Sequence, residues 1–204
     1  MEEKKTEGLL LQAIPYLGSK KILKVLTIES GIVSLMAKTK SLLPFTNPFL
    51  IAEWVYKRGN KEIHSLVDAT LRNDLSCLRT DFAILSAAGQ IAQDLLRSQY
   101  PEKEGGGLYA LSIAYLQKLP QFKSPEVLVA SFRLKLLMHD GLLSFEEESD
   151  SKNHIKHQGI LFSPIEWDLL QQLTFARQFH LIQSLSIDST MQEKIKNLFC
   201  RMIE

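Results

Sequence analysis

Cysteine is scarce in this sequence: its 204 residues include two, Cys77 and Cys200, and neither has a cysteine near it in the chain. This spacing excludes a disulfide framework and a thiolate zinc site, so we expect two reduced cysteines. A run of about 18 uncharged apolar residues, as a membrane-spanning helix requires, is also missing. The charged start MEEKKTEG is unlike a signal peptide. We therefore expect a cytoplasmic protein with no membrane contact.

The sequence also lacks a net excess of either charge, with 24 lysines and arginines against 23 acidic residues. The distribution is uneven, however. Residues 8–67 contain eight basic and three acidic side chains and carry +5, so the remaining chain carries −4. This asymmetry indicates an anionic partner for the first part of the chain.

The segment 22–40 predicts a β-hairpin with lysines at both ends. Its two runs of mostly β-favouring residues are separated by Glu29-Ser30-Gly31, where glycine can supply the positive φ of a short turn. In the second run Val33, Leu35 and Ala37 would share one face. We interpret this hairpin as part of a small barrel that presents cations to something negative.

Three further strands fit the same barrel. We predict a first strand over residues 8–14, closed by a turn at residues 15–18, a fourth over residues 49–58 and a fifth over residues 62–67. Five short strands within about 60 residues are typical of an OB-fold. Beyond residue 70 the apolar spacing changes to three and four residues, which indicates helices over residues 81–100, 108–119 and 124–141 and two more, starting near residues 163 and 189.

The predicted fold class is therefore α+β, with two domains. An OB-fold-like, DNA-binding five-stranded barrel occupies residues 1–70, and an almost wholly helical domain occupies residues 71–204, with an exposed polar insert near residues 145–159.

The order of these segments resembles bacterial recombination mediators of the RecO family. The similar motifs are short, and their order and spacing carry the resemblance up to about residue 143. They are Gly8-Leu9-Leu10-Leu11, Leu26-Thr27, Gly31-Ile32-Val33-Ser34, Ala37-Lys38, Tyr56-Lys57-Arg58-Gly59 with Ile63, the link from Arg72 to Arg79, and Phe132-Arg133-Leu134-Lys135-Leu136-Leu137 with Gly141.

The resemblance implies a function and partners. Proteins of this family bind single- and double-stranded DNA, anneal complementary strands, and with RecR help to load RecA onto DNA coated by single-strand-binding protein. The sequence departs from the family pattern twice. Thr39 stands where the family has the glycine of an Ala-Lys-Gly motif, and no cysteine lies between Cys77 and Cys200, so the four-cysteine zinc site of many members is missing.

The candidate DNA-binding residues are the basic side chains of the barrel and two aromatic residues. We expect the cations to converge on one side of the barrel and contact phosphates, and we expect Trp54 and Tyr56, with Tyr16 and Phe45 as further candidates, to stack on bases. The full prediction is Lys20, Lys21, Lys24, Lys38, Lys40, Trp54, Tyr56, Lys57, Arg58 and Lys61.

Other chemistry is not expected. His154 and His157 in an acidic segment without cysteines fall short of a structural zinc site. No nucleophile triad, phosphate loop or dinucleotide motif is present, since Gly105-Gly106-Gly107 follows no strand. We predict no catalytic residue, no metal and no cofactor. One alternative stays open: a protein-interaction scaffold with reduced or lost DNA binding.

Overall fold

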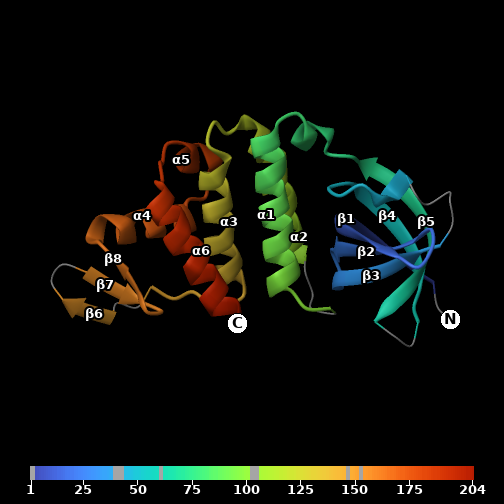
Figure 1. Ribbon diagram of the computed structural model, residues 1–204, viewed down its shortest axis with the longest axis horizontal. Coiled ribbons are helices and arrows are strands. Elements are labelled where there is room, and N and C mark those ends of the chain that lie inside the picture. The colour runs from blue at the N-terminus through green and yellow to red at the C-terminus, as the bar shows by residue number, and fades with distance from the viewer. Residues whose placement is uncertain (1–2, 39–43, 60–61, 102–105, 146–147, 152–153) are drawn as a thin grey trace. The chain divides into compact units, whose positions relative to one another are not determined.

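The computed structural model describes residues 3–38, 44–59, 62–101, 106–145, 148–151 and 154–204. Eight strands and six α-helices are named within these ranges (Figure 1). In chain order they are β1 (Glu3–Tyr16), β2 (Lys20–Thr27), β3 (Gly31–Ala37), β4 (Ile51–Lys57), β5 (Ile63–Asn73), α1 (Phe82–Ser98), α2 (Gly106–Lys118), α3 (Pro125–His139), β6 (Glu148–Ser151), β7 (His154–His157), β8 (Ile160–Phe162), α4 (Pro164–Phe175), α5 (Phe179–Gln183) and α6 (Ser189–Ile203).

The first five strands form a closed barrel in the order β1-β2-β3-β5-β4, and β4 returns to β1. The neighbouring pairs are antiparallel except β3 and β5, which run parallel where Ser34–Met36 meet Ile63–Ser65. The predicted OB-like barrel and the α+β class are confirmed. So is the hairpin of β2 and β3, in which Gly31 has φ 59°.

Alternate residues of each strand fill the barrel, because successive side chains of a strand point to opposite faces. Val33, Leu35 and Ala37 all lie in the core, as the alternation in β3 predicted. Trp54 is fully buried, and its indole Nε1 donates a hydrogen bond to the Gly8 carbonyl at 2.9 Å. The core also includes Leu10, Leu23, Val25, Leu50, Ala52, Tyr56, Leu66 and Ala69.

The largest differences from the predicted strand boundaries are in β1 and β5. β1 begins at Glu3 instead of Gly8 and runs through Pro15 and Tyr16. β1 pairs with β4 only as far as Leu9, so at Pro15 it has a partner strand, β2, on one side alone. On the unpaired side of a strand the missing N–H of proline is tolerated. At the far end of the barrel, β5 extends to Asn73, with its outer half exposed.

The helices start where capping chemistry allows. The Asp81 side chain accepts hydrogen bonds from the backbone of α1, and Pro125 occupies the first turn of α3. Ser163 and Glu166 form the predicted capping box of α4. The cap of α6 is Asp188, whose carboxylate accepts from the Met191 N–H at 2.7 Å, and not Ser189 as expected, because the carboxylate one residue earlier reaches the orphan donor.

The second part is mostly helical, as predicted, but the segment expected to be a polar insert forms strands. Residues 148–151, 154–157 and 160–162 form a three-stranded antiparallel sheet, β6-β7-β8. Gln158 and Gly159 between β7 and β8 both have positive φ, 49° and 72°, which matches a tight two-residue hairpin turn. The sheet is anchored by Trp167 of α4, which lies 5.9 Å from the Phe162 ring.

By its internal packing the chain separates into two compact units. One comprises residues 1–85 and 92–117, and the other residues 86–91 and 118–204. In the first, Tyr109 of α2 donates a hydrogen bond to Glu7 of β1 at 2.9 Å. In the second, α4, α5 and α6 pack against the nearly fully buried α3. The predicted division into domains 1–70 and 71–204 remains a prediction.

Candidate nucleic-acid interface

Lysines lie along the outer face of β2 and β3. Leu23 and Val25 point into the barrel, so the alternation places Lys20 and Lys24 on the outside of β2. On β3 the same alternation places Lys38, just after the strand, on the outside. Because Lys21 pairs with Ala37, the register brings position 20 beside position 38. We call Lys20, Lys24 and Lys38 the lysine face.

Short hydrogen bonds hold two of these lysines over the strands. The Lys24 Nζ donates to the Ser34 hydroxyl at 2.8 Å, and the Lys38 Nζ donates to the Ser65 hydroxyl at 3.2 Å. Neutral hydroxyls leave the ammonium charge uncompensated. The lysine face therefore presents positive charge on the strands that OB-folds use most often for binding nucleic acid.

The other predicted cations do not all join this face. Lys21 points along the inward side of β2 and donates to the Thr46 hydroxyl at 2.9 Å, at one end of the barrel. Lys57 lies on β4, which neighbours β1 and β5 in the barrel, and forms an ion pair with Glu3 at 3.3 Å. Lys40 and Lys61 lie outside the described residues. The expected convergence on one side thus holds for part of the set.

Ion pairs characterise the outer face of β1, β4 and β5. Glu53 accepts from Lys5 at 2.9 Å and from Arg72 at 3.0 Å. These contacts, led by the hydrogen bond from Lys5, lower the pKa of Glu53 from its ordinary value. This face is therefore charge-balanced, in contrast to the lysine face.

Two of the predicted stacking residues are buried in the barrel. Trp54 has no exposed surface and Tyr56 is 3% exposed, because both occupy inward positions of β4. A base cannot stack on either ring without opening the barrel, so we leave both out of the interface. Phe45 packs edge-on against Trp54, with ring centroids 6.5 Å apart. Tyr16, 44% exposed beside Lys20 at the end of β1, is the aromatic side chain of this group that a base could reach.

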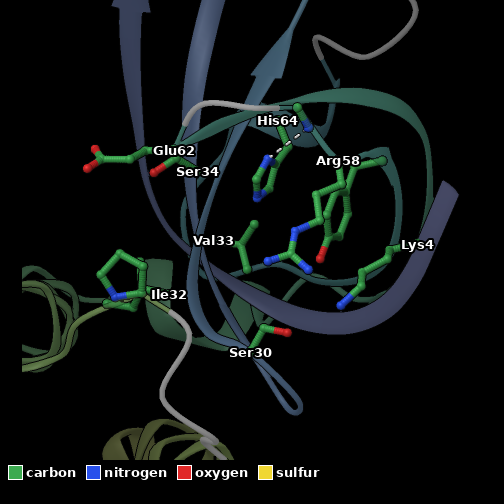
Figure 2. A pocket seen from close by; sticks show the side chains of 11 residues that line it. Lys4, Ser30, Ile32, Val33, Ser34, Arg58, Glu62 and His64 are labelled. Atoms are coloured by element: carbon green, nitrogen blue, oxygen red, sulfur yellow. Dashed lines mark hydrogen bonds between the residues drawn. The ribbon is translucent and has the colours of Figure 1, made fainter. Parts of the chain in front are cut away.

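A hollow of about 630 Å³ lies on the barrel beside the start of β3, the end of β4 and the start of β5. Figure 2 shows Lys4, Arg58 and His64 pointing into the same space from three different parts of the barrel, whereas Glu62 extends away from it. The remaining lining residues are Ser30, Ile32, Val33, Ser34, Tyr56, Gly59 and Pro101.

The ring of His64 is fixed on two sides. It stacks on Tyr56 with centroids 5.4 Å apart and an interplanar angle of 9°. Its Nδ1 accepts a hydrogen bond from the Gly59 N–H at 3.4 Å. Burial raises the pKa of Tyr56, while the nearby Arg58 charge lowers it and the Glu29 charge adds to the rise. Arg58 thus lies close enough to act on the Tyr56 hydroxyl.

Sequence reasoning singled out Arg58 but missed Lys4, Ser34 and His64 as possible binding residues. Lys4 precedes the strand that was predicted to start at Gly8, although the alternation of residues 3–8 between exposed and covered side chains is that of a strand. The sequence of residues 3–8, EKKTEG, has no alternation of apolar and polar residues, so it carried no strand signal. Ser34 and His64 carry no local signal, because their positions depend on how β3 and β5 meet.

The family model described as Recombination protein O N terminal matches residues 1–74, the segment that forms the barrel. A DNA repair protein RecO from Chlamydia pneumoniae is 26% identical over 216 positions that cover 94% of this chain and 85% of the relative. The barrel segment thus matches the RecO family, and the chain is similar to RecO proteins over most of its length. A RecO from Chlamydia muridarum is 24% identical, with 83% of each chain covered, and one from Anaeromyxobacter dehalogenans is 28% identical over 70% of this chain and 59% of the relative.

The zinc site that many RecO proteins carry does not fit this chain. No cysteine lies between Cys77 and Cys200, and within the described residues no group of three or more histidine, cysteine or acidic side chains could hold a metal. His154 and His157 are three apart in β7, so they point to opposite faces of the sheet. His157 is buried beside Trp167 at 5.5 Å. Folding without zinc stays a prediction.

In the described ranges no helix has the length and apolar content that a membrane crossing needs.

Proposed function

We propose that this protein is a DNA-binding recombination mediator of the RecO type whose lysine face contacts the phosphate backbone. The match of residues 1–74 to the RecO family model and the similarity to RecO proteins support a role in DNA repair and recombination. The observation that carries the finer proposal is the separation of charge on the barrel: Lys20, Lys24 and Lys38 bond to hydroxyls or lie exposed, whereas Lys5, Lys57 and Arg72 are matched by carboxylates.

The chemistry of the lysine face predicts how it binds. A lysine ammonium contacts phosphate as a point charge without reading bases, so binding is insensitive to sequence and weakened by salt. Both single and double strands offer that backbone. Tyr16, exposed beside Lys20, can stack on an unpaired base, which adds affinity for single strands.

The resemblance to RecO mediators extends the proposal to partners. Holding two strands on cationic surfaces reduces the repulsion between their phosphates, which favours annealing. We propose that the protein acts with a RecR-type partner and with single-strand-binding protein to load RecA onto DNA. We also propose that it does so in the cytoplasm. The proposal assigns the chain no catalytic step and no cofactor.

A pair of charge-matched variants tests the DNA-binding surface. The first replaces Lys20, Lys24 and Lys38 with glutamine, and the control replaces Lys5, Lys57 and Arg72 with glutamine. Both lose three positive charges from the barrel, so a non-specific effect of net charge is equal in the two. We expect fluorescence anisotropy with labelled single- and double-stranded oligonucleotides to show weaker binding for the first variant, and strand-annealing rates to fall with it.

Equal losses in the two variants would show that the lysine face has no special role. If the unmodified protein bound neither form of DNA, the scaffold alternative would replace the proposal.

A further inference from the structure

The hollow beside β3 has a lining of mixed chemistry. Lys4, Arg58 and His64 contribute nitrogen-bearing side chains that point into it (Figure 2). Ile32, Val33 and Pro101 add apolar groups to the lining, and of these three Pro101 is exposed, whereas Ile32 and Val33 are buried. Ser30 and Ser34 add hydroxyls that can donate or accept hydrogen bonds.

The carboxylates near the hollow do not line its cationic side. Glu62 belongs to the rim but extends away from the space that the three basic side chains share (Figure 2). Glu29 acts on the Tyr56 hydroxyl, yet it is not among the lining residues. The local field inside the hollow therefore favours an anion.

We propose that this hollow binds one phosphate-bearing nucleotide unit, with its phosphate against Lys4 and Arg58 and its base against Pro101. The unit can be a free mononucleotide or the phosphorylated end of a DNA strand. The second source rests on the proposed DNA-binding function, and the first does not.

Size and wall chemistry favour a nucleotide over inorganic phosphate. A volume of about 630 Å³ is in the range of small-molecule sites and far exceeds what a lone phosphate fills. Apolar surface contributes nothing to binding a phosphate, whereas a base presents two flat faces that gain from leaving water. Arginine can also hold a phosphate by two parallel hydrogen bonds, which positions it.

The hollow is continuous with the lysine face through one residue. Ser34 lines the hollow, and its hydroxyl accepts the hydrogen bond from Lys24 of the lysine face at 2.8 Å. A strand whose backbone follows the lysine face thus has its next position at the mouth of the hollow. A strand end, unlike an internal nucleotide, can enter without a sharp turn of the backbone.

The test compares Arg58→Gln with Arg72→Gln in the full-length chain. Both substitutions remove one guanidinium from the β4–β5 pair, but Arg72 lies at its opposite end, bonds to Glu53 and does not line the hollow. Titration with dAMP, followed by backbone amide NMR, should shift the signals of residues 30–34 and 62–64. Arg58→Gln should weaken dAMP binding about tenfold, the factor expected for one charge-assisted hydrogen bond, and Arg72→Gln should leave it unchanged.

Titrations with inorganic phosphate and with three oligonucleotides distinguish the sources. The oligonucleotides carry a 5′-phosphate, a 3′-phosphate or no terminal phosphate. A preference for one phosphorylated end that Arg58→Gln removes supports the strand-end source. Equal affinity for all three, with dAMP binding intact, supports the free nucleotide and overturns the strand-end source.

Two results would overturn the nucleotide site itself. One is that dAMP shifts no NMR signal of the residues around the hollow. If oligonucleotides still bind through the lysine face, the proposed function survives that result. The other is inorganic phosphate that binds as tightly as dAMP, because the apolar groups of the lining would then contribute nothing. If no oligonucleotide binds but dAMP does, the proposed function fails and the site stands.

Discussion

The salt dependence of DNA binding should reveal the lysine face directly. Each phosphate that a cation neutralises on single-stranded DNA releases counterions and contributes about 0.7 to the slope of log affinity against log salt concentration. Lys20, Lys24 and Lys38 offer three such contacts, so their replacement by glutamine should flatten the slope by about 2. The hydroxyl partners of Lys24 and Lys38 hold those ammonium groups over the strands without cancelling their charge.

That difference is large enough to measure. Over a fourfold rise in salt, from about 50 to about 200 mM, a slope difference of 2 corresponds to about a 16-fold greater loss of affinity for the unmodified protein. Fluorescence anisotropy of a labelled oligonucleotide across a salt series gives both slopes. The control variant at Lys5, Lys57 and Arg72 should keep the original slope, since those cations already have carboxylate partners. Identical slopes for all three proteins would refute the assignment of phosphate contacts to this face.

Two further predictions concern stability. Gly8→Ala should lower the free energy of unfolding by about 1–3 kcal/mol in a urea titration, because the new Cβ would lie 2.5 Å from Val25 Cγ1 and 2.9 Å from the Leu26 carbonyl. The control Gly89→Ala, with open space around it in α1, should raise the free energy of unfolding by about 0.5–1 kcal/mol. An unchanged stability of Gly8→Ala would contradict this packing. Desolvation raises the pKa of Glu166, but hydrogen bonds from Lys194 and Ser163 outweigh it and hold the pKa below its ordinary value. The stability that this lowered pKa provides is present above the pKa of glutamate in the unfolded chain and is lost as the pH falls through the pKa of Glu166 in the folded protein. Acid should therefore destabilise Glu166→Gln less than the unmodified protein.

Local patterns predicted the barrel where inward and outward residues alternate along a strand. In β3 the inward Val33, Leu35 and Ala37 could be separated from outward Ser34 and Met36 by counting. The same counting, applied to β4, would have placed Trp54 and Tyr56 inside, since both share a face with the apolar Ala52. Their assignment to DNA binding was based on residue type alone, whereas their position in the strand places both side chains inside the barrel.

The small sheet was missed for a different reason. Its strands have three or four residues each, too short for a periodic signal, and β6 is made of polar residues. Its turn residues, Gln158 and Gly159, are a weaker hairpin signature than Asn-Gly. What holds it is an aromatic cluster around Trp167, to which Phe145, His157 and Phe162 come from different elements. No local window of the sequence contains that cluster.

The hollow was also beyond the sequence, because it depends on a meeting of distant strands. Lys4, Arg58 and His64 belong to the start of β1, the exit of β4 and the start of β5. Their convergence requires barrel closure, which composition cannot specify.

The parallel contact between β3 and β5 has a dynamic consequence. Among the described residues this seam consists of three paired positions, Ser34–Met36 with Ile63–Ser65, whereas β1 and β2 pair over eight. Few hydrogen bonds must break to part it, so the seam should be a low-energy opening of the barrel. Amide protons of residues 34–36 that bond across it should exchange with solvent faster than those linking β1 to β2. Transient separation of β3 from β5 would widen the hollow beside them while the rest of the barrel stays folded.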